Sequence, residues 1–242
     1  PGLTALIYVF DWGQQYTWAW AVAWGAMTFI SVALLFLSPL LMGIFNKYEP
    51  LEDGPLKSAI EQLAETLSFE MNGIYKMDGS KRSSKANAFF AGFGSFRRIA
   101  LFDTLIEKLE IEEINAVLAH EIGHCKHKHI SKQFLFNSAT MALSFFLVQE
   151  LLMNRGLFEF FQMEPSTGLS LFLIFGFVLS PLHVITGLVS NILSRRYEFQ
   201  ADAFATQKAK GGSALISSLE KLSQDSLTKL QPHPLKAFIE HS

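Results

Sequence analysis

The sequence predicts a mainly helical protein that crosses a membrane several times and carries a small β-sheet. Half of its 242 residues are hydrophobic and only 17% are charged, and the mean hydropathy is +0.25. The run from Trp12 to Asn46 has no charged residue and exceeds the roughly 20 residues that cross about 30 Å of hydrocarbon as a helix. Short aromatic and β-branched segments between residues 73 and 103, separated by turns, predict the sheet.

Four segments follow from these patterns. Residues 1–46 hold an N-terminal segment and a transmembrane helix, and residues 47–132 hold the sheet and soluble helices. Residues 133–194 hold two further spans, and residues 195–242 hold a helix and a C-terminal tail. The second segment carries twelve Lys or Arg residues, so the positive-inside rule places it in the cytoplasm. A bacterial inner membrane and an endoplasmic reticulum membrane both fit this multi-pass orientation.

The two later spans are weaker than the first. Gln133 to Met153 contains one charge, Glu150, whereas Pro165 to Ser194 has no Asp, Glu, Lys or Arg but includes Pro181. A proline kinks a helix, and a kinked or tilted helix still crosses the bilayer. Three spans place the second and fourth segments on the same side of the membrane, so both could contribute to one site.

The second segment alternates helical and extended patterns. Lys57 to Leu67 has apolar residues at helical spacing and predicts an amphipathic helix. Gly73 to Asp78, Asn87 to Phe93 and Arg98 to Asp103 predict three strands. We expect the helix to pack against the one that follows the sheet.

That following helix carries the motif H-E-x-x-H at His120, Glu121 and His124. Acidic residues precede it and apolar residues recur every three to four positions, as in a helix. Histidines four apart share one face, so two imidazoles could bind one zinc ion, with Glu121 beside it as general base in peptide hydrolysis. The residues would then form a zincin-like site with one zinc per chain. The alternative is two surface histidines on an ordinary helix.

A second candidate pair, Glu198 and Asp202, follows the third span. These carboxylates are four residues apart and face the same way on a helix. One could bind zinc while the other accepts a hydrogen bond from a ligand histidine. Alternatively, both acids pair with Arg195 and Arg196, and spacing does not decide between these interpretations.

An edge strand beside the motif would hold an extended substrate through main-chain hydrogen bonds. Asn87 and Ala88 are the candidates for this contact, and an ordinary hairpin strand with Phe89 in the core is the alternative. The lipid bilayer is an expected partner. Nucleic acid is not, because the net charge is −2 and no basic block is interleaved with aromatic residues.

Five motifs in order make the chain resemble the integral-membrane CAAX prenyl endopeptidases, a family of zinc metallopeptidases of the gluzincin type. The resemblance covers nearly the whole chain. It implies zinc ligands at His120, His124 and Glu198, a general base at Glu121, hydrogen-bonding support from Asp202, and a substrate strand at Asn87-Ala88. The motifs are Asp78-Gly-Ser-Lys-Arg-Ser-Ser84, Asn87-Ala-Phe-Phe90, Arg98-Ile-Ala-Leu-Phe-Asp-Thr-Leu105, His120-Glu-Ile-Gly-His124 and Ser194-Arg-Arg-Tyr-Glu-Phe-Gln-Ala-Asp202.

The resemblance also implies a function. We expect a membrane-embedded zinc metalloendopeptidase, open to the cytoplasm, that hydrolyses peptide bonds at the C-terminal CAAX sequence of prenylated proteins. A heat-shock-type quality-control metallopeptidase has the same ligands and is the first alternative. A non-catalytic, zinc-stabilised membrane scaffold is the second. Glu121 argues against the scaffold, because a structural zinc needs no general base and usually has four protein ligands.

Overall fold

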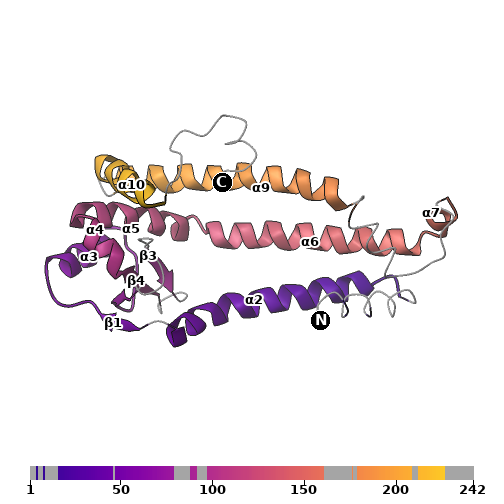
Figure 1. Cartoon of the computed structure of the whole chain (residues 1–242), viewed down its shortest axis with the longest axis horizontal. Helices are drawn as coiled ribbons and strands as arrows, with labels where there is room; N and C mark the ends of the chain where they lie inside the picture. Colours follow the sequence, from indigo (N-terminus) through magenta and orange to yellow (C-terminus); the bar gives the residue numbers. More distant parts are fainter. Residues whose placement is uncertain are drawn as a thin grey trace. The chain divides into compact units, whose positions relative to one another are not determined.

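A computed structural model shows how these patterns fold (Figure 1). The helices and strands named below are those of the residues that the structure describes. The described residues are 4, 8, 16–45, 47–78, 88–91, 97–160, 176, 179–208 and 212–226. The chain divides into two compact units, one formed by Pro1–Leu34 with Ser131–Ile192 and the other by Leu35–Ile130 with Leu193–Ser242.

The first unit is helical. It contains the first part of α2 (Ala19–Phe45), most of α6 (His129–Met153), α7 (Arg155–Phe160) and the start of α9 (Leu179–Lys208). The Trp24 indole N–H donates to the Ser138 carbonyl oxygen at 3.0 Å and ties α2 to α6. The side chains that form its small core are Ala23, Phe145, Val148, Leu152, Phe158 and Leu179.

Two of the three predicted membrane spans lie within the described residues. Ala19–Leu37 and His129–Met153 are long and apolar enough to cross a bilayer. Much of the α2 surface is apolar and exposed; Phe29, for example, is 73% exposed. In the third predicted span, Pro165 to Ser194, residues 165–175, 177 and 178 lie outside the described residues, and the part from Leu179 onward is the beginning of α9.

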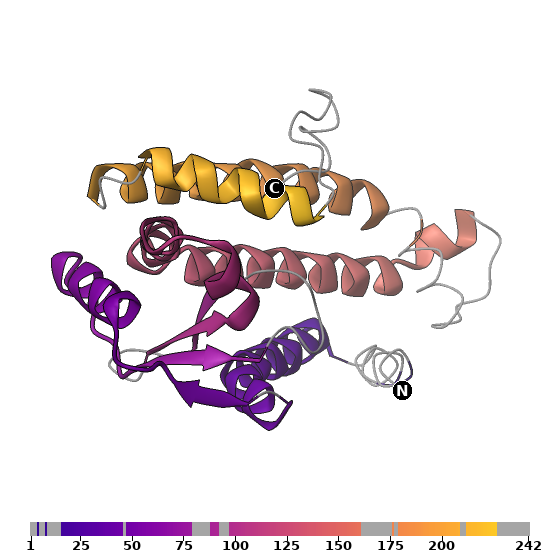
Figure 2. The ribbon, with the colours of Figure 1, turned by 60° about the vertical axis from the view of Figure 1, so that its left-hand side comes forward.

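The second unit contains a four-stranded sheet among the described residues, with the strand order β1-β2-β4-β3 (Figure 2). Strands β2 (Ile74–Met77), β3 (Ala88–Ala91) and β4 (Arg98–Phe102) correspond to the three predicted strands. β1 (Tyr48–Pro50) was not predicted and pairs antiparallel with β2. β2 and β4 run parallel, and β3 pairs antiparallel with β4 at the end of the sheet.

Helices α4 (Asp103–Lys108) and α5 (Ile111–Lys126) contact this sheet, and α3 (Pro55–Thr66) and α10 (Gly212–Ser226) pack against α5. Ile60 and Leu63 of α3 share one core with Leu118 of α5 and Leu101 of β4. The predicted packing of the amphipathic helix against the motif helix is therefore confirmed, and so is the expectation of a mainly helical chain with a small sheet.

Buried polar contacts hold the N-terminal end of α5 to α10. Glu113 is only 6% exposed, and its carboxylate accepts hydrogen bonds from Ser217 Oγ at 2.6 Å and Lys221 Nζ at 2.7 Å. It also accepts from the Glu110 backbone N–H at 2.8 Å, which caps the helix. Burial raises the pKa of Glu113, but the hydrogen bonds from Lys221 and Ser217 outweigh it and hold that pKa below its usual value. We call Glu113, Ser217 and Lys221 the anchor cluster.

Candidate metal centre

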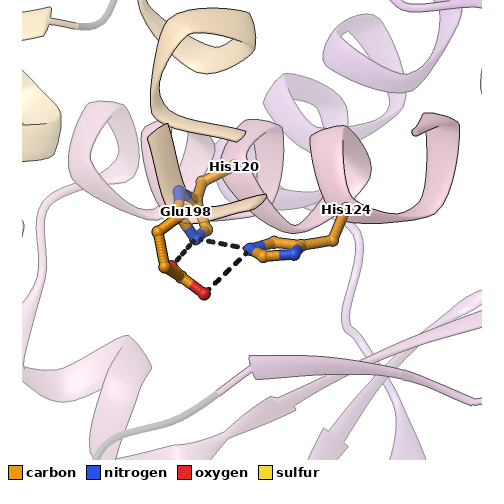
Figure 3. Close-up of side chains that lie close together, drawn as sticks. All are labelled: His120, His124 and Glu198. Atoms are coloured by element: carbon orange, nitrogen blue, oxygen red, sulfur yellow. Dashed lines mark hydrogen bonds and ion pairs between the residues drawn. The ribbon is translucent and has the colours of Figure 1, made fainter. Parts of the chain in front are cut away.

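The two motif histidines lie on the side of α5 away from its apolar core face. Ile114, Leu118 and Ile122 bury that face, each with no more than 1% exposed. The His120 and His124 side chains are 17% and 20% exposed, one turn apart, and Figure 3 shows both rings pointing to one place. Their Nε2 atoms are 3.1 Å apart.

The third side chain of this group comes from α9. One Glu198 oxygen is 3.4 Å from His120 Nε2 and the other is 3.7 Å from His124 Nε2, so the carboxylate faces both rings (Figure 3). Contacts with His120 and then His124 hold the pKa of Glu198 well below its usual range. Within the described residues, this trio could hold a metal ion.

The approach of α9 to α5 depends on a glycine. A Cβ atom at Gly123 would lie 3.1 Å from Ala201 Cα and 3.3 Å from the Ala201 carbonyl oxygen, closer than ordinary contacts. Ala201 itself is fully buried. Small residues at both positions let the helix backbones come close, and Glu198 lies less than one turn before Ala201 on α9. The sequence pattern gives no sign of this contact, because Gly123 occupies a variable position of H-E-x-x-H.

Asp202 supports His120 on the side away from the trio. Its Oδ1 is 2.8 Å from His120 Nδ1. A carboxylate oxygen accepts, so Nδ1–H donates and the neutral ring keeps a lone pair on Nε2. Burial lowers the pKa of His120, but its contact with Glu198 and the charge of Asp202 raise that pKa overall. The contact is compatible with the predicted support of His120, and that role of Asp202 stays a prediction.

The trio fits a zinc ion. At metal–ligand distances of about 2.0–2.1 Å, ligand atoms at the corners of a tetrahedron lie about 3.3 Å apart. His120 Nε2 lies 3.1 Å from His124 Nε2 and 3.4 Å from one Glu198 oxygen, both close to that value, and one ligand atom from each of the three residues lies within 4.8 Å of the others. Two imidazole nitrogens and a carboxylate are also a common catalytic zinc set. The liganding roles of His120, His124 and Glu198 stay predictions, as does the identity of the metal.

Glu121 lies beside the trio and is partly buried. Burial raises its pKa, and the charges of His120 and His124 lower that pKa in part. A carboxylate next to a metal site with a raised pKa is suited to take up and return a proton. Its role as general base stays a prediction.

Of the two predicted substrate-binding residues, the structure describes only Ala88. Asn87 lies outside the described residues. Ala88 begins β3, at the end of the sheet, and its side chain is buried in the core shared with α5. Only its backbone is therefore placed to contact a substrate strand, and the binding role stays a prediction.

The chain belongs to peptidase family M48, whose family model matches residues 50–238. The CAAX prenyl protease 1 of Saccharomyces cerevisiae is 36% identical to it over 239 residues, covering 90% of this chain and 52% of that protein. The human CAAX prenyl protease 1 homolog is 33% identical, covering 94% of this chain and 56% of its own length. The chain thus spans about half the length of the curated relatives it matches.

A solved structure resembles the fold. The crystal structure of S. mikatae Ste24p superposes with a TM-score of 0.83 at 31% sequence identity. The match covers 99% of this chain and 59% of that one. The arrangement of helices and sheet described above is therefore similar to that of a solved relative.

Proposed function

We propose that this chain is the zinc-binding part of a membrane metalloendopeptidase that cleaves prenylated CAAX proteins beside the lipid-bearing cysteine. The carrying observation is the convergence of His120, His124 and Glu198 from two helices, with Glu121 adjacent. Membership of peptidase family M48 and the names of the similar proteins support the reaction and the substrate class.

In this proposal, His120, His124 and Glu198 hold one zinc ion, which when bound polarises a substrate carbonyl and lowers the pKa of water. A Glu121 carboxylate oxygen takes the proton of the attacking water. It then returns that proton to the amide nitrogen as the C–N bond breaks, so the protein ends each cycle unchanged. Asp202 keeps the His120 ring in one orientation by accepting a hydrogen bond from its Nδ1–H.

The peptide would lie extended along β3. This strand is at the end of the sheet, and its Ala88 shares a core with Ala119 and Ile122 of α5. A substrate strand added there would be held by main-chain hydrogen bonds from Asn87 and Ala88. The two candidate spans support a location in a membrane, and we propose a cytoplasmic site in a bacterial inner membrane or the endoplasmic reticulum.

The test compares a farnesylated CAAX peptide with the same peptide lacking the lipid, using the full-length protein and its Glu121→Gln variant. We expect one cut, beside the modified cysteine, only in the lipidated peptide. The variant should keep its zinc and lose about 10²–10⁴-fold in rate. Equal cutting of both peptides at scattered bonds would favour a quality-control peptidase. Zinc binding without any cutting would favour a scaffold.

A further inference from the structure

His129 lies close to the metal trio without belonging to it. It is the first residue of α6 and is only 3% exposed. Between α5 and α6, Lys128 adopts a left-handed backbone with φ of +56°. A long side chain rarely takes this conformation, and such strained positions cluster where a structure must aim a functional group. The turn brings the His129 ring back to within 5.0 Å of the His124 ring.

Two hydrogen bonds connect His129 to its surroundings and define where the protons lie. His129 Nε2 is 3.0 Å from the Gln200 side-chain oxygen, and His129 Nδ1 is 3.0 Å from His124 Nδ1. An amide oxygen only accepts, so His129 Nε2–H donates to Gln200. A neutral imidazole carries a single proton, so in that form His129 Nδ1 accepts and His124 Nδ1–H donates.

The hydrogen bond at His124 Nδ1 decides the state of Nε2, on the opposite side of the ring. With its proton on Nδ1, His124 keeps a lone pair on Nε2, the atom 3.1 Å from His120 Nε2. Asp202 has the same effect on His120. Two lone pairs facing each other beside a carboxylate repel unless a cation lies between them. We propose that His129 and Gln200 are positioning residues that hold His124 in the Nδ1–H tautomer and aim its Nε2 at the zinc.

A third residue fixes the plane of the His129 ring. Tyr197 stacks on it with ring centroids 4.4 Å apart and planes at 15°. Tyr197 and Gln200 flank Glu198 on α9. One helix would thus supply the third ligand and also orient the support of the second ligand. Such supporting hydrogen bonds fix the tautomer and ring orientation of ligand histidines, and their loss typically costs 10- to 100-fold in metal affinity.

The inference rests on the proposed zinc site and is tested by zinc affinity, measured on the full-length protein by competition with a chelator. His129→Phe keeps an aromatic ring but removes both nitrogens, and Gln200→Leu removes the acceptor. Both should weaken zinc binding by about 10- to 100-fold. Gln200→Glu keeps an accepting oxygen and should restore near-wild-type affinity. The matched control is His127→Phe, because His127 is exposed and stacks on His129 with centroids 5.4 Å apart.

A second readout separates positioning from a purely structural effect. In the Co²⁺-loaded protein, His129→Phe should change the visible absorption bands that report ligand geometry, whereas His127→Phe should not. Unchanged affinity and spectrum in His129→Phe, with one zinc per wild-type chain, would overturn this inference and leave the proposed function intact. A wild type that binds no zinc would overturn the proposed function itself. If His129→Phe does not fold, equal affinities of Gln200→Leu and Gln200→Glu would overturn the inference.

Discussion

Each end of helix α5 holds a cluster of polar side chains, but the two clusters differ in whether their hydrogen-bond acceptors face donors. At the N-terminal end, Glu113 of the anchor cluster accepts hydrogen bonds from a hydroxyl, an ammonium and a backbone N–H, so acceptors meet donors. At the other end, the Nε2 atoms of His120 and His124 face each other and the Glu198 carboxylate within 3.1–3.7 Å. With both rings in the proposed Nδ1–H tautomer, these facing atoms are all acceptors.

The difference teaches how to distinguish a structural cluster from a ligand site. A buried polar group normally has a complementary partner within the protein. If hydrogen bonds hold the proton of each histidine on Nδ1, the two Nε2 atoms and the carboxylate near them have no proton to share, and a cation between them would relieve their repulsion. The anchor cluster should therefore respond to mutation through stability alone, and the metal trio mainly through zinc affinity.

The largest expected effect comes from removing a carboxylate at the metal end. Glu198→Ala leaves two ligands and should lower zinc affinity by more than about 100-fold, beyond the loss expected for supporting residues. Chelator competition measures it. Glu65→Ala, a change at an exposed glutamate of α3, is the control. Wild-type affinity in Glu198→Ala would show that another residue completes the site.

The next effect tests whether the helix approach positions the third ligand. Gly123→Ala places a Cβ against Ala201, so α9 must move or the core must strain, at about 1–3 kcal/mol. We expect a lower melting temperature together with weaker zinc binding. Gly187→Ala is the control, because Gly187 is also a helical glycine, on α9, and nothing lies within 4 Å of a Cβ there. If the two variants had equal melting temperatures and equal zinc affinities, the close contact between Gly123 and Ala201 would not be what positions Glu198.

The anchor cluster should show the reverse pattern. Lys221→Met leaves the buried Glu113 carboxylate with one charged partner fewer, and we expect a loss of about 1–2 kcal/mol in unfolding free energy. The figure is modest because the Lys221 side chain is 42% exposed and water screens the pair. Zinc affinity should stay at the wild-type value. A change in affinity would contradict the separation between the two ends of α5.

The smallest effect is a pH dependence. The folded-state pKa of Glu113 is lowered, so its contribution to stability is present above the usual glutamate pKa of about 4.3 and is lost as pH falls through the folded value. Thermal unfolding in excess chelator should show wild type more stable than Glu113→Gln at pH 7. That gap should shrink on acidification below about pH 4.3. A constant gap would mean that the carboxylate charge adds nothing.

Periodic and local features were predictable from the sequence. The amphipathic pattern from Lys57 to Leu67 gave α3, and the motif helix formed with its histidines one turn apart, because both depend on spacing within one element. β1 was missed because Tyr48–Pro50 is three residues long and ends in proline, as a linker does. Its pairing with β2 depends on a partner more than twenty residues away.

Contacts between distant elements limited the prediction of the site. Glu198 and Asp202 were equivalent on spacing, and only the tertiary structure places Glu198 toward both rings and Asp202 behind His120. His129 carried a weak signal, five residues after His124. Gln200 and Gly123 carried none, because their importance comes from α9 crossing α5. Glu113 read as an ordinary acidic helix start and not as the centre of the anchor cluster.

The two variable positions of H-E-x-x-H, Ile122 and Gly123, are both constrained by packing in this chain. Successive helix residues point about 100° apart, and here four consecutive positions each meet a different environment. His120 belongs to the trio, Glu121 lies beside it, Ile122 is buried in the core and Gly123 contacts α9. The packing of Ile122 and Gly123 sets the rotation of α5 about its axis. A larger residue at position 123 or a polar one at position 122 would disturb this packing and change the direction of both histidine rings. The five residues of the motif therefore determine the orientation of the site as well as supplying its predicted ligands.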